Sequence, residues 1–158
     1  MPVFQTTQVI KSDISRCWSF FSDPANLANI TPPSMKFIIK YPNPVPEMYQ
    51  GMIIKYTVSP LFKMPVEWIT EITEVSKPNY FVDNQVKGPY RVWHHQHFFE
   101  EVEEGVKITD IVTYKLPLGF FGDLFAGWLV RKKIEGIFEY RRNAILRAFG
   151  SHKFHKSH

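Results

Sequence analysis

Histidines are concentrated in one short stretch of the chain, GPYRVWHHQHFFEE at residues 88–101. This stretch carries His94, His95 and His97, which are half of the six histidines in the sequence. Imidazole can bind a metal ion, and it can transfer protons near neutral pH because its unperturbed pKa is about 6.5. His95 and His97 are two positions apart, so on a β-strand both side chains lie on the same face. The stretch therefore predicts a metal site, an acid–base site, or a strand that buries imidazoles for another purpose.

The neighbours of these histidines depend on the turns on either side. With two-residue turns at Gly88-Pro89 and Glu104-Gly105, cross-strand partners can be assigned, and such partners share a face of the sheet. One face, mainly apolar and aromatic, then collects Tyr80, Val82, Asn84, Trp93, His95, His97, Phe99, Asp110, Val112, Tyr114 and Leu116. The other face is polar and should meet water; it collects Asp83, Gln85, His94, Gln96, Thr113 and Lys115. A turn that differs by one residue would move part of these sets to the opposite face.

Three interpretations of the inward polar groups remain open. His95, His97, Asp110 and Tyr114 could form a hydrogen-bonded core network, such as His97 with Asp110 and His95 with Tyr114, since buried polar groups need partners. They could instead anchor a ligand at the bottom of an apolar cavity, or the two histidines could bind a metal ion with Asp110 as third ligand. The segment HQHFFEE resembles the first cupin motif, but Gly88 precedes His95 by one residue too many and the second motif is missing. We therefore predict no metal site.

Other catalytic chemistries find little support in the sequence. The one cysteine, Cys17, lies on the apolar face of a short helix, where a buried inert thiol is the usual state. No serine lies in a G-x-S-x-G turn, and no glycine-rich phosphate loop is present. We expect no nucleophilic catalysis and assign no cofactor.

The elements that position these residues follow from hydrophobic periodicity. Helical spacing and capping residues predict a short helix at 14–22, a second that starts at Asp23-Pro24, and a long helix at about 120–149. Alternating, β-rich stretches predict strands at 3–10, 35–41, 52–59, 64–75, 80–86, 90–102 and 106–117. Short turns between consecutive strands imply an antiparallel sheet. Its apolar face needs cover, and the long helix is the element large enough to provide it.

Composition and charge narrow the class of protein. The chain has 158 residues, 44% hydrophobic and 22% charged, which fits one globular domain over residues 1–150 with a flexible tail at 151–158. The net charge is +4, with an excess of basic residues near the C-terminus that we interpret mainly as a solvated helix face. No nucleic-acid-binding motif accompanies it. A single cysteine, no signal peptide and no long apolar run predict a cytoplasmic protein.

Several stretches together resemble the START-like superfamily, also called SRPBCC, and in particular a bacterial group of ligand-binding SRPBCC domains. They are CWSFFSDPANLANITPP (17–33), FVDNQVKGPYRVWHHQHFFEE (81–101), TDIVTYKLPLGFFGDLF (109–125) and IFEYRR (137–142). The resemblance implies an α+β helix-grip fold, in which a curved seven-stranded antiparallel sheet wraps around a long C-terminal helix, with two short helices after the first strand. It also implies a cavity for a hydrophobic small molecule. It supplies no catalytic residues that map onto this sequence.

The function we predict is binding of a hydrophobic or amphipathic small molecule, of lipid, polyketide, quinone or aromatic type, between the sheet and the C-terminal helix. The expected ligand-binding residues are Met52, Trp68, Tyr80, Trp93, His95, His97, Phe99, Asp110, Val112, Tyr114, Phe138 and Arg141. The aromatic residues Phe120, Phe121, Phe125 and Trp128 either form the mouth of the cavity or pack at the start of the helix.

Two alternatives of other classes remain. One is a cyclase- or hydratase-type enzyme in which His95 or His97 acts as the acid–base group and Asp110 orients it. The other is an interaction module, because the basic helix and the phenylalanine-rich segment could contact a membrane surface, although the sequence favours this less. We expect a monomer or a homodimer that binds no nucleic acid.

Overall fold

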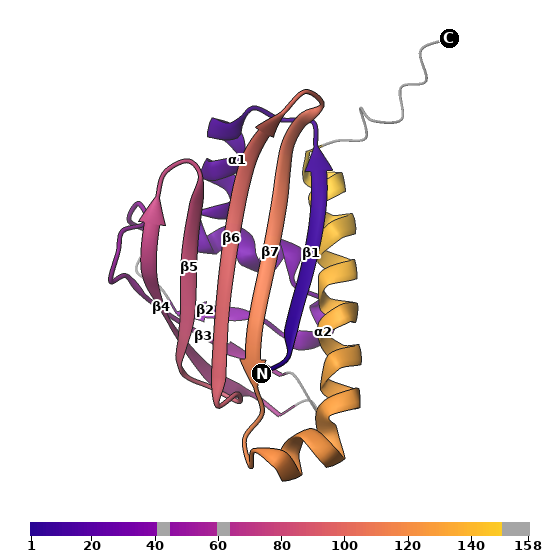
Figure 1. Cartoon of the computed structure of the whole chain (residues 1–158). Coiled ribbons are helices and arrows are strands. Elements are labelled where there is room, and N and C mark those ends of the chain that lie inside the picture. The colour runs from indigo at the N-terminus through magenta and orange to yellow at the C-terminus, as the bar shows by residue number, and fades with distance from the viewer. Residues whose placement is uncertain (41–44, 60–63, 150–158) are drawn as a thin grey trace.

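Seven strands form one antiparallel sheet in the computed structural model, which describes residues 1–40, 45–59 and 64–149 (Figure 1). The strands are β1 (Val3–Ile10), β2 (Ile38–Lys40), β3 (Ile53–Val58), β4 (Val66–Ser76), β5 (Tyr80–Lys87), β6 (Val92–Val102) and β7 (Gly105–Lys115). Their order in the sheet is β1-β7-β6-β5-β4-β3-β2, so the first strand pairs with the last. The tail expected at 151–158 lies outside the described residues.

The helices cover one face of this sheet (Figure 1). They are α1 (Ile14–Phe21), the 3₁₀ segments η1 (Pro24–Ile30) and η2 (Pro33–Met35), and the long α2 (Phe120–Ala148). The Asp13 carboxylate accepts a hydrogen bond from the Arg16 amide at 2.8 Å, and Asp23 accepts one from Ala25 at 2.9 Å, so both starts are capped as the sequence indicates. The α+β helix-grip fold, with short helices after the first strand, is confirmed.

The core is aromatic where α1 meets the sheet. Trp18 is 2% exposed, and its ring meets Phe81 and Phe99 edge-on at 5.8 and 6.0 Å between centroids. A second cluster lies between β7 and α2, where Val112 and Tyr114 pack with Ile134 and Phe138. These two clusters hold α1 and α2 against the sheet, and the candidate site described below lies between them.

The register of β5 against β6 differs from the predicted one. The last pair between these strands is Asn84 with His94, so residues 85–93 connect them outside the ladder, where a two-residue turn was predicted. Within this connection the Gln85 side chain bonds both backbone groups of Tyr90, at 2.6 and 3.1 Å. The pairing becomes Phe81 with His97 and Asp83 with His95.

This one-residue change reverses the faces of β5. Asp83 points inward, whereas Tyr80, Val82 and Asn84 lie on the opposite face. Tyr80 packs there on Phe98, with centroids 5.8 Å apart. The inward positions predicted for Tyr80, Val82 and Asn84, and the outward one for Asp83, are therefore wrong.

The turn between β6 and β7 is also displaced, but with a different consequence. Val102 pairs with Gly105, so the turn is Glu103-Glu104 and the register shifts by two residues. A shift of two preserves the faces because side chains alternate with a period of two. His95, His97 and Asp110 therefore all point inward as predicted, with Asp110 directly opposite His97.

Candidate functional site

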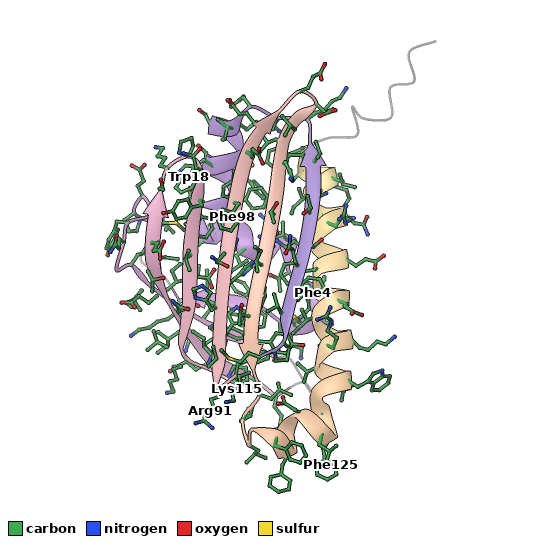
Figure 2. The ribbon with its side chains drawn as sticks, in the orientation of Figure 1. Phe4, Trp18, Arg91, Phe98, Lys115 and Phe125 are labelled. Carbon is green, nitrogen blue, oxygen red and sulfur yellow. The ribbon has the colours of Figure 1, made fainter. Side chains whose placement is uncertain are left out.

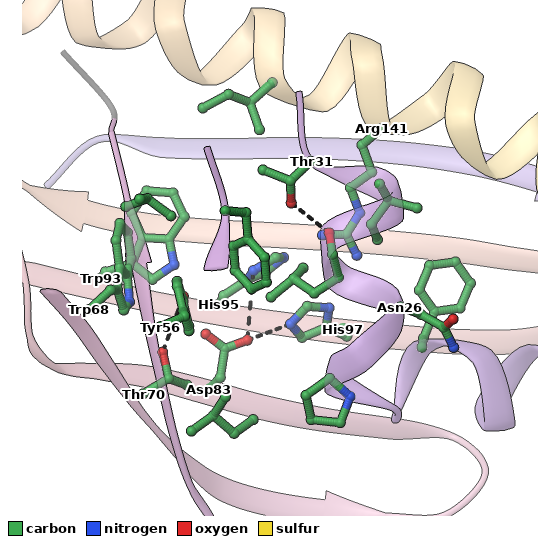
Figure 3. Close-up of a pocket in the computed structure, with 18 of the residues that line it drawn as sticks. Asn26, Thr31, Tyr56, Trp68, Thr70, Asp83, Trp93, His95, His97 and Arg141 are labelled. Carbon is green, nitrogen blue, oxygen red and sulfur yellow. Dashed lines mark hydrogen bonds and ion pairs between the residues drawn. The ribbon is translucent and has the colours of Figure 1, made fainter. Parts of the chain in front are cut away.

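A cavity of about 170 Å³ lies between the inner face of the sheet and the helices (Figure 3). Strands β3 to β6 supply one side, η1 and η2 close an end, and Ile134, Ile137, Phe138 and Arg141 of α2 complete the wall. Two exposed residues, Asp23 and Lys133, lie at its rim. The cavity therefore combines an enclosed apolar interior with an edge that reaches solvent.

Aromatic rings form one end of this cavity. Trp68 of β4 stacks on Tyr56 at 5.8 Å and meets Trp93 edge-on at 5.4 Å. Tyr90 packs on Trp93 at 4.7 Å. Trp68, Thr70 and Ile72 alternate along β4 and are all buried, as predicted for its inner face. Perpendicular rings of this kind offer both faces and edges to an apolar guest.

A network of charged side chains forms the opposite part of the wall, drawn from four elements. Nε2 of His97 lies 2.6 Å from Asp83 Oδ2, and Nε2 of His95 lies 2.8 Å from Asp110 Oδ1. Asp83 is thus the cross-strand partner of His95 but bonds His97, and Asp110 is the cross-strand partner of His97 but bonds His95. Arg141 of α2 approaches Asp110 at 3.6 Å, which connects the helix to the sheet.

Burial and neighbouring charges push the pKa values of the two histidines apart. Burial alone would lower the pKa of His97, but Asp110 and Asp83 outweigh it and raise that pKa above its usual value. Nδ1 of His97 lies 3.3 Å from Asp110 Oδ1 without the alignment of a hydrogen bond, so this contact acts through charge. Burial and the charge of His97 lower the pKa of His95.

The carboxylates of the network stay ionised despite their burial. Burial would raise the pKa of Asp110, but Arg141 and the bond from His95 hold it well below its usual range. Asp83 follows the same pattern, with the bond from His97 as the main opposing effect. At pH values at which His97 is protonated, its charge and that of Arg141 balance the two carboxylates.

We expect stability to depend on pH in a way that a His97→Gln variant changes. A raised pKa means that the stabilisation from protonated His97 is complete below about pH 6.5, the value for an unfolded histidine, and is lost as pH rises through the folded pKa. Wild type should therefore lose stability above neutral pH, and the variant should not show that decline. Urea unfolding between pH 6 and 9 measures it. Parallel declines in the two proteins would contradict the charge assignment.

The same groups also satisfy the geometry of a metal site. One ligand atom each from Asp83, His95 and His97 lies within 4.8 Å of the others. Two imidazoles and a carboxylate are a ligand set for zinc or iron. However, the Nε2 atom of each histidine is already bonded to a carboxylate, and protonated His97 together with Arg141 balances the two carboxylates without an ion. The arrangement therefore fits a proton-held network at least as well as a metal centre.

The structure brings half of the predicted ligand-binding residues together around the cavity. They are Trp68, Trp93, His95, His97, Phe138 and Arg141. Asp110 stands behind the histidines, bonded to His95, and the bond predicted between His95 and Tyr114 is replaced by this one. The fully packed residues Met52, Phe99, Val112 and Tyr114 belong to the core and do not line the cavity.

Other predicted positions lie away from the cavity. Tyr80 is on the far face of the sheet, and none of Phe120, Phe121, Phe125 and Trp128 lines the cavity, so they do not form its mouth. Sequence reasoning missed Asp83, Tyr56 and Tyr90. The sequence does contain a signal for Asp83. This residue follows Phe81 by two positions, so on a strand its carboxylate lies on the same face as that apolar side chain.

Comparison with solved structures places this fold among known ones. A protein of Thermus thermophilus, TTHA0849, superposes with a TM-score of 0.65 at 17% identity, over 94% of this chain and all of the other. Protein Ms6760 of Mycobacterium smegmatis gives 0.66 at 20% identity, over 94% and 92% of the two chains. Major latex-like protein 151 of Panax ginseng gives 0.69 at 13% identity, over 94% and 97%.

The chain shares its helix-grip fold with these structures. No protein-family model matches the sequence, and no curated protein sequence does. Within residues 1–40, 45–59 and 64–149, no helix has the length and apolarity needed to cross a membrane.

Proposed function

We propose that the protein binds a small, neutral, mainly apolar molecule in the cavity between the sheet and α2. The observation that carries this proposal is a mainly apolar, aromatic-lined space of about 170 Å³ whose wall includes residues with unpartnered hydrogen-bond donors. An apolar cavity of about 150 Å³ is enough to hold benzene. The volume therefore favours a single-ring aromatic or quinone-type molecule, or a short acyl chain, over a long-chain lipid.

The polar groups of the wall indicate what the ligand carries. Nε1 of Trp68 and Nε of Arg141 are buried and have no hydrogen-bond partner within the described residues. Both atoms can only donate, so they favour a ligand with an acceptor oxygen. The neutral charge of the network favours a carbonyl or hydroxyl oxygen over a carboxylate, which would bring an uncompensated charge into the cavity.

The acid–base alternative is not favoured. The Nε2 atoms of His95 and His97 are each bonded to a carboxylate, and both rings are 5% exposed. The network supports the role of a fixed polar wall. A cytoplasmic location remains a prediction, which the free thiol of Cys17 supports.

Three one-ring compounds of similar size test the proposal. Acetophenone has a neutral carbonyl, ethylbenzene lacks an acceptor, and benzoate is charged. We expect calorimetry to rank acetophenone first, ethylbenzene second and benzoate last, with each step about tenfold for one hydrogen bond or one buried charge.

A Trp68→Phe variant provides the matched control, because it keeps an aromatic ring and removes the donor. Its preference for acetophenone over ethylbenzene should fall, because one of the two unpartnered donors is lost. Binding of none of the three compounds by wild type, or equal binding of benzoate, would contradict the proposal.

A further inference from the structure

The first three turns of α2 carry large apolar side chains on their outer side. These residues, here called the apolar tip, are Leu118 just before the helix and Phe120, Phe121, Leu124, Phe125, Trp128 and Leu129 within it, each between 47% and 81% exposed. Scattered exposed hydrophobic residues are normal, but a contiguous group of this kind marks an interaction site. The tip projects beyond the ends of β6 and β7 (Figure 1).

In this segment the small residues face the protein and the large apolar residues face solvent, which is the opposite of the usual amphipathic helix. Its inner side is made of the small residues Gly122 and Ala126, followed by Val130. A Cβ atom at position 122 would collide with the carbonyl oxygen of Pro117, so the helix approaches the end of β7 by its smallest residue. Phenylalanine and tryptophan therefore point away from the protein although the inner side requires none of them.

Basic residues surround the apolar tip. Arg91 and Lys115 lie at the same end of the molecule as Phe125 (Figure 2). Lys132 and Lys133 follow Trp128 by about one turn of α2. Among the residues that the structure describes, no ion pair neutralises these four side chains, whereas Arg131 is paired with Glu135 at 3.1 Å. Asp123 is the acidic residue in the first turn of the helix.

We propose that the apolar tip docks into the surface of an anionic lipid bilayer. Aromatic and aliphatic side chains enter the boundary between headgroups and acyl chains, where tryptophan and phenylalanine are favoured. The four basic residues then lie at the level of the anionic headgroups and are attracted to them. The proposal rests on the exposed tip and its charges and is independent of the ligand in the cavity.

Charge distinguishes a bilayer from a second copy of the chain as the occupant. A two-fold contact between tips would bring the same basic residues of both copies toward each other, because a symmetric interface uses the same patch twice. Like charges facing across an interface oppose association. An anionic surface turns the same residues into attractive groups.

Sedimentation of the full chain with vesicles tests the docking. We expect binding to phosphatidylcholine vesicles that contain phosphatidylglycerol, weaker binding to phosphatidylcholine alone, and a decrease with added salt. The Phe125→Ser/Trp128→Ser variant should bind at least tenfold more weakly, since two large side chains no longer enter the bilayer. Lys132→Gln and Lys133→Gln should each cost about fivefold at low salt.

Two controls separate docking from general stickiness. Val9→Ser removes an apolar side chain that is 44% exposed on β1, where this strand pairs with the start of β7 at the end of the sheet opposite the tip, and should leave vesicle binding unchanged. Trp128 is exposed, so vesicles should shift its fluorescence to the blue, and the Trp128→Phe variant should lose this shift while it still binds. Failure of wild type to bind anionic vesicles, or a dimer that the Phe125→Ser/Trp128→Ser variant dissociates, would overturn the proposal.

Discussion

Replacing Asp110 with asparagine should destabilise the protein by about 3–5 kcal/mol, because it leaves the buried guanidinium of Arg141 without its counter-charge and removes one of the two carboxylates beside His97. Asparagine preserves the shape of the side chain, so the loss reports charge and not packing. For a chain of this size the melting temperature should fall by roughly 10 °C. Urea unfolding and calorimetry at pH 7 measure both quantities.

The matched control makes the same chemical change at the surface. Glu67→Gln removes a carboxylate that pairs with Lys87 at 3.0 Å, where the two side chains are 40% and 66% exposed, and should have no measurable effect. Adding Arg141→Met to Asp110→Asn should recover part of the lost stability, since it removes the uncompensated charge. Equal effects of Asp110→Asn and Glu67→Gln would disprove the network as a buried charge system.

Phe138→Ala should be about as costly, at roughly 3–5 kcal/mol. Phe138 is 7% exposed, packs on Phe4 at 4.9 Å and on the His95 ring at 5.7 Å, and lines the cavity. Its removal should also enlarge the cavity, so that the two-ring ketone 2-acetonaphthone gains affinity relative to acetophenone. Chemical unfolding and calorimetric titration measure the two effects.

The same helix offers the control for this substitution. Phe125→Ala makes an identical change at a position that is 81% exposed, and it should leave both the free energy of unfolding and the ligand preference unchanged. A cost at position 125 comparable to that at position 138 would mean that the apolar tip is part of the folded core.

The sequence predicts the elements of this fold well because each has its own periodicity. The alternation in β4 and β7 and the helical spacing in α2 are local signals, and the inward direction of His95 and His97 survives because the β6–β7 register shifts by an even number of residues. The α+β class and the pairing of neighbouring strands follow from the same signals. Local patterns therefore suffice wherever the face on which a side chain lies depends only on whether its position along the strand is odd or even.

The site could be predicted only in part because it depends on non-local detail. The face of β5 is reversed because residues 85–93 connect it to β6 outside the ladder, in a connection that the side-chain amide of Gln85 organises, and no composition rule specifies such a contact. A two-residue turn at the same place would turn Asp83 to solvent. Whether a buried ring such as Phe99 lines a cavity or fills the core depends on how tightly its neighbours pack, which periodicity does not encode.

For the proposed ligand, the bridge from Arg141 to Asp110 bears on the route into the cavity. It fastens the middle of α2 to the sheet, so lifting that helix would separate opposite charges in a dry environment. The η1 segment on the other side is held by 3₁₀ hydrogen bonds and the Asp23 cap, which are weaker constraints. We therefore expect the proposed ligand to enter and leave past residues 24–30, while α2 stays in place against the sheet.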